Sequence, residues 1–247
     1  MLFILTILKT FGPYVTRTLG IDISPNMIST YLSRAASAGL PPSTVDAVVG
    51  DLFDKANPEP SHLSDPQWWN FDIATVGFGF HHFEDVVYAA KQLKERLRPG
   101  GVLVINDFLE GGDLLADEDG NPIPDSGGNH AVHGHEHGHG HGHEHGHGHS
   151  HDHESHNHDH ETKHSHHPSD KDFTNPNSTL HKKMTDSIVV PHFAITGVID
   201  FFTAAGFVDV DVITLKERSY MEFGGTKLWR TILIARGRRP EGEKSEL

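Results

Sequence analysis

The feature that most constrains this 247-residue sequence is a central region without apolar periodicity. Eighteen of the chain's 23 histidines lie between His130 and His167, and residues 134–160 read GHEHGHGHGHEHGHGHSHDHESHNHDH. From Gly111 to about Asn177 the residues are mainly Gly, Asp, Asn and then His, a composition typical of loops and low-complexity segments. Roughly 35–40 of these residues cannot contribute to a core, which leaves about 200 that can. The sequence therefore predicts one domain interrupted by a large insertion.

Composition narrows the class of protein further. The absence of cysteine excludes disulfides, thiolate metal sites and cysteine nucleophiles. A formal net charge of −14, with histidine counted as neutral, argues against partners such as nucleic acid or an anionic membrane surface. The opening MLFILTIL is apolar but shorter than a membrane span, and it lacks the basic start and cleavage site of a signal peptide. We therefore expect a cytoplasmic protein, and the sequence leaves its oligomeric state open.

The first half of the chain alternates strand-like and helix-like segments. Four apolar segments are predicted to be buried strands: TLGIDIS, DAVVGD, FDIATVGF and VLVIND. After the first of them a helix is predicted to begin, with Ser24 as N-cap and Pro25 at its first position, and to end at Gly39. EDVVYAAKQLKERL is a second amphipathic helix. Strands that alternate with helices predict an α/β fold with a parallel sheet.

Regular structure is predicted to return after residue 177. AITGVIDFFTAAGF carries apolar residues at helical spacing, namely Ile195, Val198, Ile199 and Phe202. VDVDVITL and LWRTILIARG are predicted strands, and the turn residues at 223–225 indicate that these two strands pair as antiparallel neighbours. The predicted organisation is an α/β domain over residues 1–110 and 178–239, a His-rich insertion over 111–177 and a charged tail over 240–247.

Polar residues follow each predicted strand of the first half. The first two strands end in Asp22 and Asp51, the third runs into GFGFHHFED, and the fourth ends in Asn106 and Asp107. In a doubly wound sheet, ligands bind beyond the carboxyl ends of the strands. A carboxylate after an early strand can accept two hydrogen bonds from a ribose diol, and one on the next strand can meet an adenine amino group. Asp22 and Asp51 would alternatively serve as helix caps.

Several segments together resemble a known family. GIDISPNMI, VVGDLFD, FDIATVGFGFHHFED and LRPGGVLVINDF are similar, in this order, to consecutive motifs of the class I S-adenosylmethionine-dependent methyltransferases. The match is closest to the small-molecule branch that includes the ubiquinone/menaquinone-type enzymes. HFAITGVIDFFTAAGFVDVDV and RTILIARG resemble the last helix and final strand pair of the family. The resemblance covers residues 10–110 and 187–237 and implies a Rossmann-like, mostly parallel sheet with an antiparallel C-terminal strand.

The same resemblance implies a cofactor and roles for individual residues. The cofactor would be S-adenosylmethionine, and the reaction would be methyl transfer to a small-molecule acceptor. Asp22 would bind the ribose, with Ile23 packing on the adenine, and Asp51 would accept from the adenine amino group, with Leu52 beside it. Gly77 and Phe78 would line the methionine end, and His81, His82 and Glu84 would face the mouth of the substrate site. His81, His82 and Asp107 are the catalytic candidates; the histidines could instead cap or pack under a helix, and Asp107 could be a turn residue.

One family motif is missing from the sequence. The family places a glycine-rich GxGxG turn between its first strand and first helix, where it lets the backbone approach the cofactor. FGPYVTRTLGIDIS matches the end of that helix and the second strand, so the motif and the first strand would lie upstream of about residue 6. Either the sequence starts late or cofactor binding has been lost. The first alternative is favoured because a central strand is paired at both edges. MLFILTIL would then be a remnant of the first helix or a strand in the gap, and cofactor binding would be impaired.

The histidine tract allows two interpretations. Its alternating His-Gly and His-Glu units offer imidazole ligands for Zn or Ni, among them His135, His137, His139, His141 and His143. The ligands have no fixed tetrahedral spacing, so such binding would be loose. The alternative is a low-complexity expansion of a surface loop, since added length costs little closure entropy. The sequence thus leaves three functions open: a methyltransferase, a metal-binding protein that uses the tract, or a non-catalytic methyltransferase-like fragment.

We predict that residues 113–175 lack regular structure and that the isolated tract binds Zn²⁺ or Ni²⁺ with a dissociation constant of about 1 μM or weaker. The affinity is limited because no metal site is preformed, so binding must first order many flexible imidazole ligands. Titration calorimetry on a peptide spanning residues 130–167 measures this affinity. A single tight stoichiometric site would contradict the prediction and favour the metal-binding function.

Overall fold

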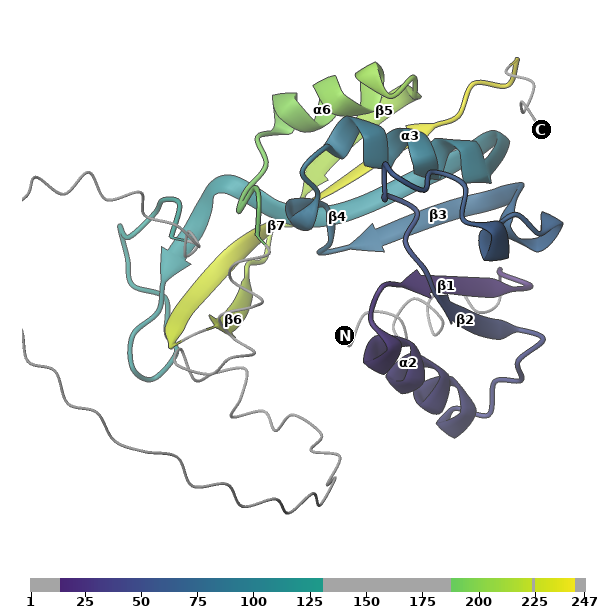
Figure 1. Cartoon of the computed structure of the whole chain (residues 1–247). Helices are drawn as coiled ribbons and strands as arrows, with labels where there is room; N and C mark the ends of the chain where they lie inside the picture. Colours follow the sequence, from purple (N-terminus) through teal and green to yellow (C-terminus); the bar gives the residue numbers. More distant parts are fainter. Residues whose placement is uncertain (1–13, 131–187, 224, 243–247) are drawn as a thin grey trace, which may run out of the picture.

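The computed structural model describes residues 14–130, 188–223 and 225–242 of the chain (Figure 1). The interpretations of MLFILTIL and of the tract beyond His130 concern residues outside these ranges. The helices and strands are, in chain order, β1 (Thr18–Asp22), α2 (Pro25–Ser37), β2 (Val45–Val49), β3 (Phe71–Gly77), α3 (Val86–Arg96), β4 (Leu97–Leu115), α6 (Ile195–Ala204), β5 (Val208–Thr214), β6 (Ser219–Phe223) and β7 (Thr226–Arg238). Three short 3-10 turns, Ser61–Leu63, Pro66–Trp68 and Phe80–His82, flank β3.

The first two strands form a small parallel sheet. β1 pairs with β2 along its whole length, and α2 connects them. The helix begins where the sequence predicts: the Ser24 hydroxyl accepts a hydrogen bond from the Met27 N–H at 3.4 Å, and Pro25 occupies the first turn. A proline fits there because the N–H that it lacks would have had no partner within the helix. The predicted helix and both predicted strands are confirmed.

The remaining strands form a five-stranded mixed sheet. Its order is β3-β4-β7-β5, and β6 pairs with another part of β7. β3 and β4 run parallel, whereas β7 is antiparallel to β4, β5 and β6. The predicted α/β class, with parallel strands followed by an antiparallel C-terminal strand, is therefore confirmed. The resemblance implies a single sheet over residues 10–110 and 187–237, and this is wrong, because β1 and β2 are hydrogen-bonded only to each other among the strands that the structure describes.

The two sheets nevertheless share one hydrophobic core. α3 and α6 lie side by side along the larger sheet, and α2 lies beside β1 and β2 on the far side of the molecule (Figure 1). Leu19, Ile21 and Val48 of the small sheet pack against the buried cluster that contains Leu103 and Ile105 of β4. Burial of apolar side chains from both sheets in one cluster holds them together without shared strand hydrogen bonds.

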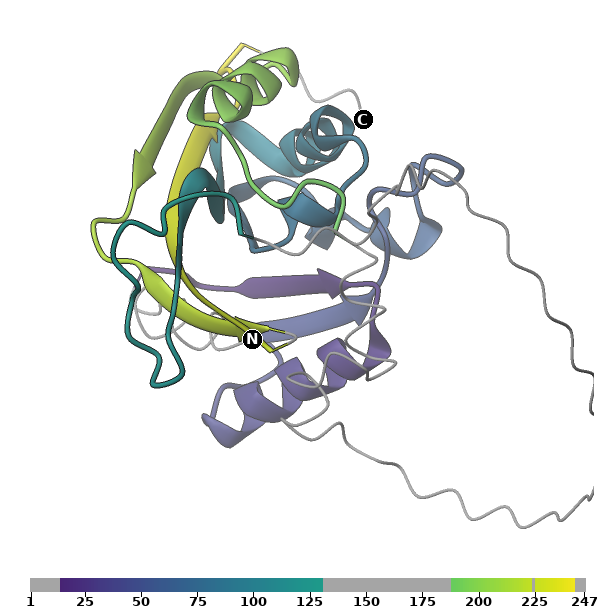
Figure 2. The same cartoon turned by 90° about the vertical axis from the view of Figure 1, so that its left-hand side faces the viewer.

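The strand predictions missed two features around the insertion. β4 does not end near Asp107 but continues to Leu115, because β7 bends and stays paired with it (Figure 2). Residues 116–130 then form turns that close back on β4 through the bridges Ala116–Pro122 and Asp113–Gly128. The prediction that residues from 111 are loop or disordered is therefore wrong up to Leu115, where β4 ends. β6 was not predicted, and it is β6 that forms the hairpin with β7 at the turn after Phe223.

The buried side of α6 also differs from the prediction. Val198 and Phe202 are buried as expected, but Phe201 completes this face, and Ile195 and Ile199 are exposed. Phe202 packs against Phe201 and Phe207, with ring centroids 5.1 and 5.3 Å away. No helix in the described ranges combines the length and the apolar character that a membrane span requires.

We predict that Phe202→Ala lowers the free energy of unfolding by about 3–5 kcal/mol, because it leaves a cavity in a fully buried site. Ile199→Ala on the same helix is the matched control and should cost less than about 1 kcal/mol, since this side chain is 38% exposed. Denaturant unfolding of both variants measures the difference. An equal loss of unfolding free energy in the two variants would show that Ile199 is also buried, as the predicted stripe of α6 implies.

Candidate functional site

The carboxyl ends of β1 and β2 bring Asp22 and Asp51 to the same end of the small sheet. The strands are parallel, and the Gly50 N–H donates to the Asp22 carbonyl at 3.1 Å just before Asp51. Each carboxylate is oriented by its own turn: Asp22 Oδ1 accepts from the Ser24 N–H at 2.8 Å, and Asp51 Oδ1 accepts from the Phe53 N–H at 2.7 Å. Asp22 is not the helix cap, because Ser24 has that role. Both acids therefore present carboxylate oxygens at one edge.

Their apolar neighbours differ in exposure. Ile23 is 70% exposed next to Asp22, so its side chain is available to a ligand. Leu52 is 5% exposed and belongs to the hydrophobic core. Of the two residues predicted to lie beside the adenine, Ile23 thus offers an open surface, and Leu52 fixes the backbone that carries Asp51.

The loops after β2 and β3 contact each other, which joins the strand ends of the two sheets. The Phe53 and Phe83 rings pack with centroids 4.3 Å apart. Lys55 Nζ forms an ion pair with Asp85 Oδ2 at 2.7 Å. Because Phe53 follows Asp51 and Phe83 follows His81 closely in the sequence, the carboxylates of the small sheet and the histidines of the large sheet lie on the same side of the molecule.

A tight turn follows β3. Phe78 has a φ of 51°, a left-handed conformation that is unusual for a bulky residue and is held here by surrounding contacts. Its N–H donates to the Asn106 carbonyl at 2.9 Å, and its ring stacks on Phe108 of β4 with a centroid distance of 5.0 Å. Gly77 is exposed at the end of the strand. The turn thus places Phe78 over the middle of β4, next to Phe108.

His81 and Asp107 form a buried pair beyond these rings. His81 Nδ1 lies 2.9 Å from Asp107 Oδ1, and the His81 N–H donates to Asp107 Oδ2 at 3.2 Å. The Phe108 N–H also donates to Oδ1, so the fully buried carboxylate is well satisfied. Within the described residues His81 Nε2 forms no hydrogen bond. Asp107 lies inside β4 and is not a turn residue. A carboxylate on Nδ1 favours the tautomer in which Nε2 is a proton acceptor.

The other predicted residues of this edge are exposed. The His82 ring lies 4.1 Å from that of His81 but is open to solvent, as is Glu84.

Asn106, which precedes Asp107, is a further candidate that sequence reasoning did not include among the site residues. Its Nδ2 is buried and has no hydrogen-bond partner in the described structure, so it is a donor available to a ligand. Its predicted position at a strand end was the only sequence signal.

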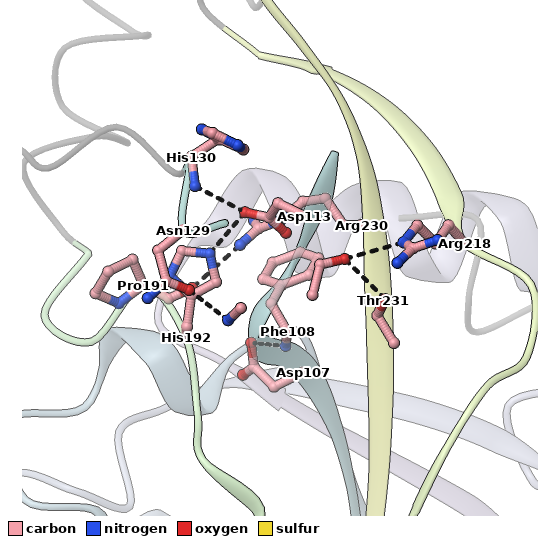
Figure 3. Close-up of polar contacts among 12 residues, drawn as sticks. Asp107, Phe108, Asp113, Asn129, His130, Pro191, His192, Arg218, Arg230 and Thr231 are labelled. Carbon is pink, nitrogen blue, oxygen red and sulfur yellow. Dashed lines mark hydrogen bonds and ion pairs between the residues drawn. The ribbon is translucent and has the colours of Figure 1, made fainter. Parts of the chain in front are cut away.

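A second buried charged cluster was not predicted (Figure 3). Asp113 of β4 lies opposite Arg230 of β7, and its Oδ1 accepts from Arg230 Nε at 3.0 Å. Its Oδ2 lies 2.7 Å from His192 Nε2 and also accepts from the His130 N–H at 3.3 Å. Asp113 is fully buried, and His192 and Arg230 nearly so. The cluster therefore gathers three distant parts of the chain on one carboxylate.

The electrostatics of this cluster favour a charged Asp113. Burial alone would raise the pKa of the Asp113 carboxyl, but the hydrogen bond from His192 and the adjacent Arg230 outweigh it and lower that pKa. Burial lowers the pKa of the Arg230 guanidinium, and Asp113 opposes this effect. The guanidinium carbon of Arg230 also lies 3.4 Å from the Phe108 ring centroid, a cation–π contact. Phe108 thus separates the Asp113 cluster from the His81–Asp107 pair.

The described residues contain no group of three or more His, Asp or Glu side chains suited to a metal ion. The proposed metal ligands His135, His137, His139, His141 and His143 lie outside these residues.

Comparison with known proteins connects this geometry to a family. Residues 3–103 match a family model described as a methyltransferase domain. An uncharacterised methyltransferase of Schizosaccharomyces pombe is 28% identical over 113 residues, which are 46% of this chain and 37% of the relative. A demethylmenaquinone methyltransferase of Staphylococcus aureus is 31% identical over 96 residues, or 39% of this chain and 34% of that protein. The chain thus matches only about a third of the length of these curated relatives.

A solved structure supports the fold. A Bacillus halodurans protein, provisionally named a methyltransferase, superimposes with a TM-score of 0.50 at 12% sequence identity. The superposition covers 95% of this chain and 88% of that chain. At this identity the likeness concerns the fold alone, and it agrees with a Rossmann-like α/β sheet.

We predict that Asp113→Asn lowers the free energy of unfolding by about 3–5 kcal/mol near neutral pH, because it leaves the Arg230 guanidinium buried without a counter-charge. The folded-state pKa of Asp113 is lowered, so its stabilising effect is present above the unfolded pKa of about 3.9 and is lost as pH falls through the folded value. The difference between wild type and variant should therefore shrink below about pH 4. Chemical denaturation across pH measures it.

The control for this prediction is Asp72→Asn, which removes an exposed ion pair with Arg98. It should change stability by less than about 1 kcal/mol at any pH. If the difference in unfolding free energy between wild type and Asp113→Asn stays constant down to pH 2, the role of the ionised carboxylate is contradicted.

Proposed function

We propose that this chain is a class I S-adenosylmethionine-dependent methyltransferase and that it transfers a methyl group from S-adenosylmethionine to a small-molecule acceptor. The match of residues 3–103 to a methyltransferase domain and the likeness to two methyltransferases support this proposal. The observation that carries the proposal is the convergence of Asp22, Asp51 and the buried His81–Asp107 pair on one side of two adjoining sheets. In α/β sheets this side, beyond the carboxyl ends of the strands, is where nucleotide-like ligands bind.

The nucleoside half of the cofactor would lie at the small sheet. Asp22 and Asp51 each use Oδ1 for a turn hydrogen bond, so Oδ2 remains to accept from the ribose hydroxyls and the adenine amino group, respectively. Ile23 would cover the adenine with its exposed side chain. Gly77 and Phe78 would approach the methionine half from the end of β3. The acceptor oxygens of the two carboxylates thus fit the nucleoside half of S-adenosylmethionine.

The acceptor would meet His81. S-adenosylmethionine supplies a methyl group on a sulfonium, which an aligned nucleophile attacks in line. His81, with Nδ1 fixed by Asp107, would receive the acceptor's proton on Nε2. His82 would stand at the exposed mouth of the site. The stacked Phe78 and Phe108 rings would form an apolar wall, which suits a ring-bearing acceptor. The name of the Staphylococcus aureus relative, a demethylmenaquinone methyltransferase, supports an acceptor of the quinol class.

A second candidate function, loose binding of Zn²⁺ or Ni²⁺ by the His-rich tract, is favoured by its alternating imidazoles. The two functions respond to different changes. Deletion of residues 131–167 should abolish a function that depends on metal binding by the tract, and Asp22→Ala should leave that function intact.

We predict that Asp22→Ala and Asp51→Ala each weaken binding of S-adenosylhomocysteine about 10- to 100-fold, because each removes charge-assisted hydrogen bonds. His81→Gln should leave this affinity nearly unchanged, since His81 acts on the acceptor. Titration calorimetry with S-adenosylhomocysteine measures all three. Asp72→Asn, at the opposite end of β3, is the acidic control. Unchanged affinity in both Asp22→Ala and Asp51→Ala would refute the placement of the nucleoside.

A further inference from the structure

The segment over residues 189–193, here called the strap, is hydrogen-bonded to the candidate catalytic pair. The N–H groups of Val189 and Val190 both donate to the His81 carbonyl, at 2.9 and 3.1 Å. At the other end of the strap, the Phe193 N–H donates to the Phe108 carbonyl at 2.8 Å, and the Phe193 carbonyl accepts from Glu110. The strap therefore contacts His81 at its start and β4 at its end.

The middle of the strap is held by the Asp113 cluster. His192 reaches Asp113 Oδ2 at 2.7 Å, and Arg230 Nη2 donates to the Pro191 carbonyl at 3.2 Å (Figure 3). Arg230 is itself fixed by Asp113 Oδ1. Hydrogen bonds to buried charged groups are among the stronger ones in proteins, so Asp113 dominates the attachment of the strap.

Asp113 also reaches the pair by a second route. The Arg230 guanidinium, fixed by Asp113, lies on one side of the Phe108 ring at 3.4 Å. Phe108 in turn contacts the His81 ring, with centroids 5.7 Å apart, and its N–H donates to Asp107. The backbone route through the strap and the side-chain route through Arg230 and Phe108 therefore both end at His81 and Asp107.

We propose that Asp113 is a positioning residue for the methyl transfer, and that it orients His81 through the strap and through the Arg230–Phe108 contact. This inference rests on the proposed function for its role in the reaction. Asp113 would act without touching the acceptor or the cofactor. Neither route passes through the loops that carry Asp22 and Asp51, so removal of Asp113 should disturb the acceptor side and spare the nucleoside side.

The first test is His192→Ala, which cuts the strap route and leaves the Asp113–Arg230 pair intact. Hydrogen exchange of the Val189 and Val190 amides should become about tenfold faster or more. The ring nitrogen shifts of His81, assigned by comparison with His81→Gln, should move from a single fixed tautomer toward an average of two. His130→Gln is the matched control, because His130 bonds to Asp113 only through its backbone N–H. It should change neither measurement.

The second test removes both charges together. Asp113→Asn alone can fail to fold, whereas the double variant Asp113→Asn with Arg230→Met leaves no unpaired buried charge. In this double variant we expect the His81 ring nitrogen shifts to move toward an average of two tautomers. Its dissociation constant for S-adenosylhomocysteine should stay within about twofold of the wild-type value. Wild-type exchange rates and His81 shifts in both His192→Ala and the double variant would overturn the proposal. S-adenosylhomocysteine affinity that is unchanged by both Asp22→Ala and Asp51→Ala would instead count against the proposed function, since the exchange and tautomer readouts need no ligand.

Discussion

The pairing of β4 with β7 is the interaction on which the other features depend. β4 pairs with β7 from Val102 to Phe108 and again from Asp113 to Leu115, with a shift of register between the two stretches. β4 also pairs with β3, so its first half is held at both edges. Because side chains alternate along a strand, this ladder fixes where Asp107 and Asp113 point. The irregular stretch between Phe108 and Asp113 is where the strap joins β4, through the bridge between Leu109 and Phe193.

Two fully buried carboxylates on one strand impose a strict condition on the surrounding chain. A charge removed from water must be paired and hydrogen-bonded, or the fold loses several kcal/mol. Asp107 meets this condition with His81 and two backbone N–H groups, and Asp113 meets it with Arg230, His192 and the His130 N–H. The condition links segments that the sequence separates widely, since all these partners must be in place together. The same geometry that satisfies the charges therefore assembles the candidate site.

Local features of the fold could be predicted from the sequence, whereas long-range features could not. Ser24 and Pro25 mark the start of a helix through chemistry within one turn, and the predicted strands carry enough apolar residues to be recognised. The extension of β4 was missed because EGGDLL reads as a loop, and only pairing with β7 makes it a strand. Asp113 lies 79 positions from His192 and 117 from Arg230, so no local pattern joins them. α6 likewise carries apolar residues on several sides, so the sequence predicted a stripe with Ile195 and Ile199, whereas the structure buries Phe201.

The attachment of His130 and His192 to the same oxygen of Asp113 has a consequence for how this chain tolerates change. His130 and His192 are thereby held close together by residues of the domain itself. The separation of these two residues does not depend on what connects them. Segments of very different length and composition can therefore be inserted between them at small cost in closure entropy. For protein engineering, this makes the stretch between His130 and His192 a natural position at which to insert a reporter domain or an affinity peptide.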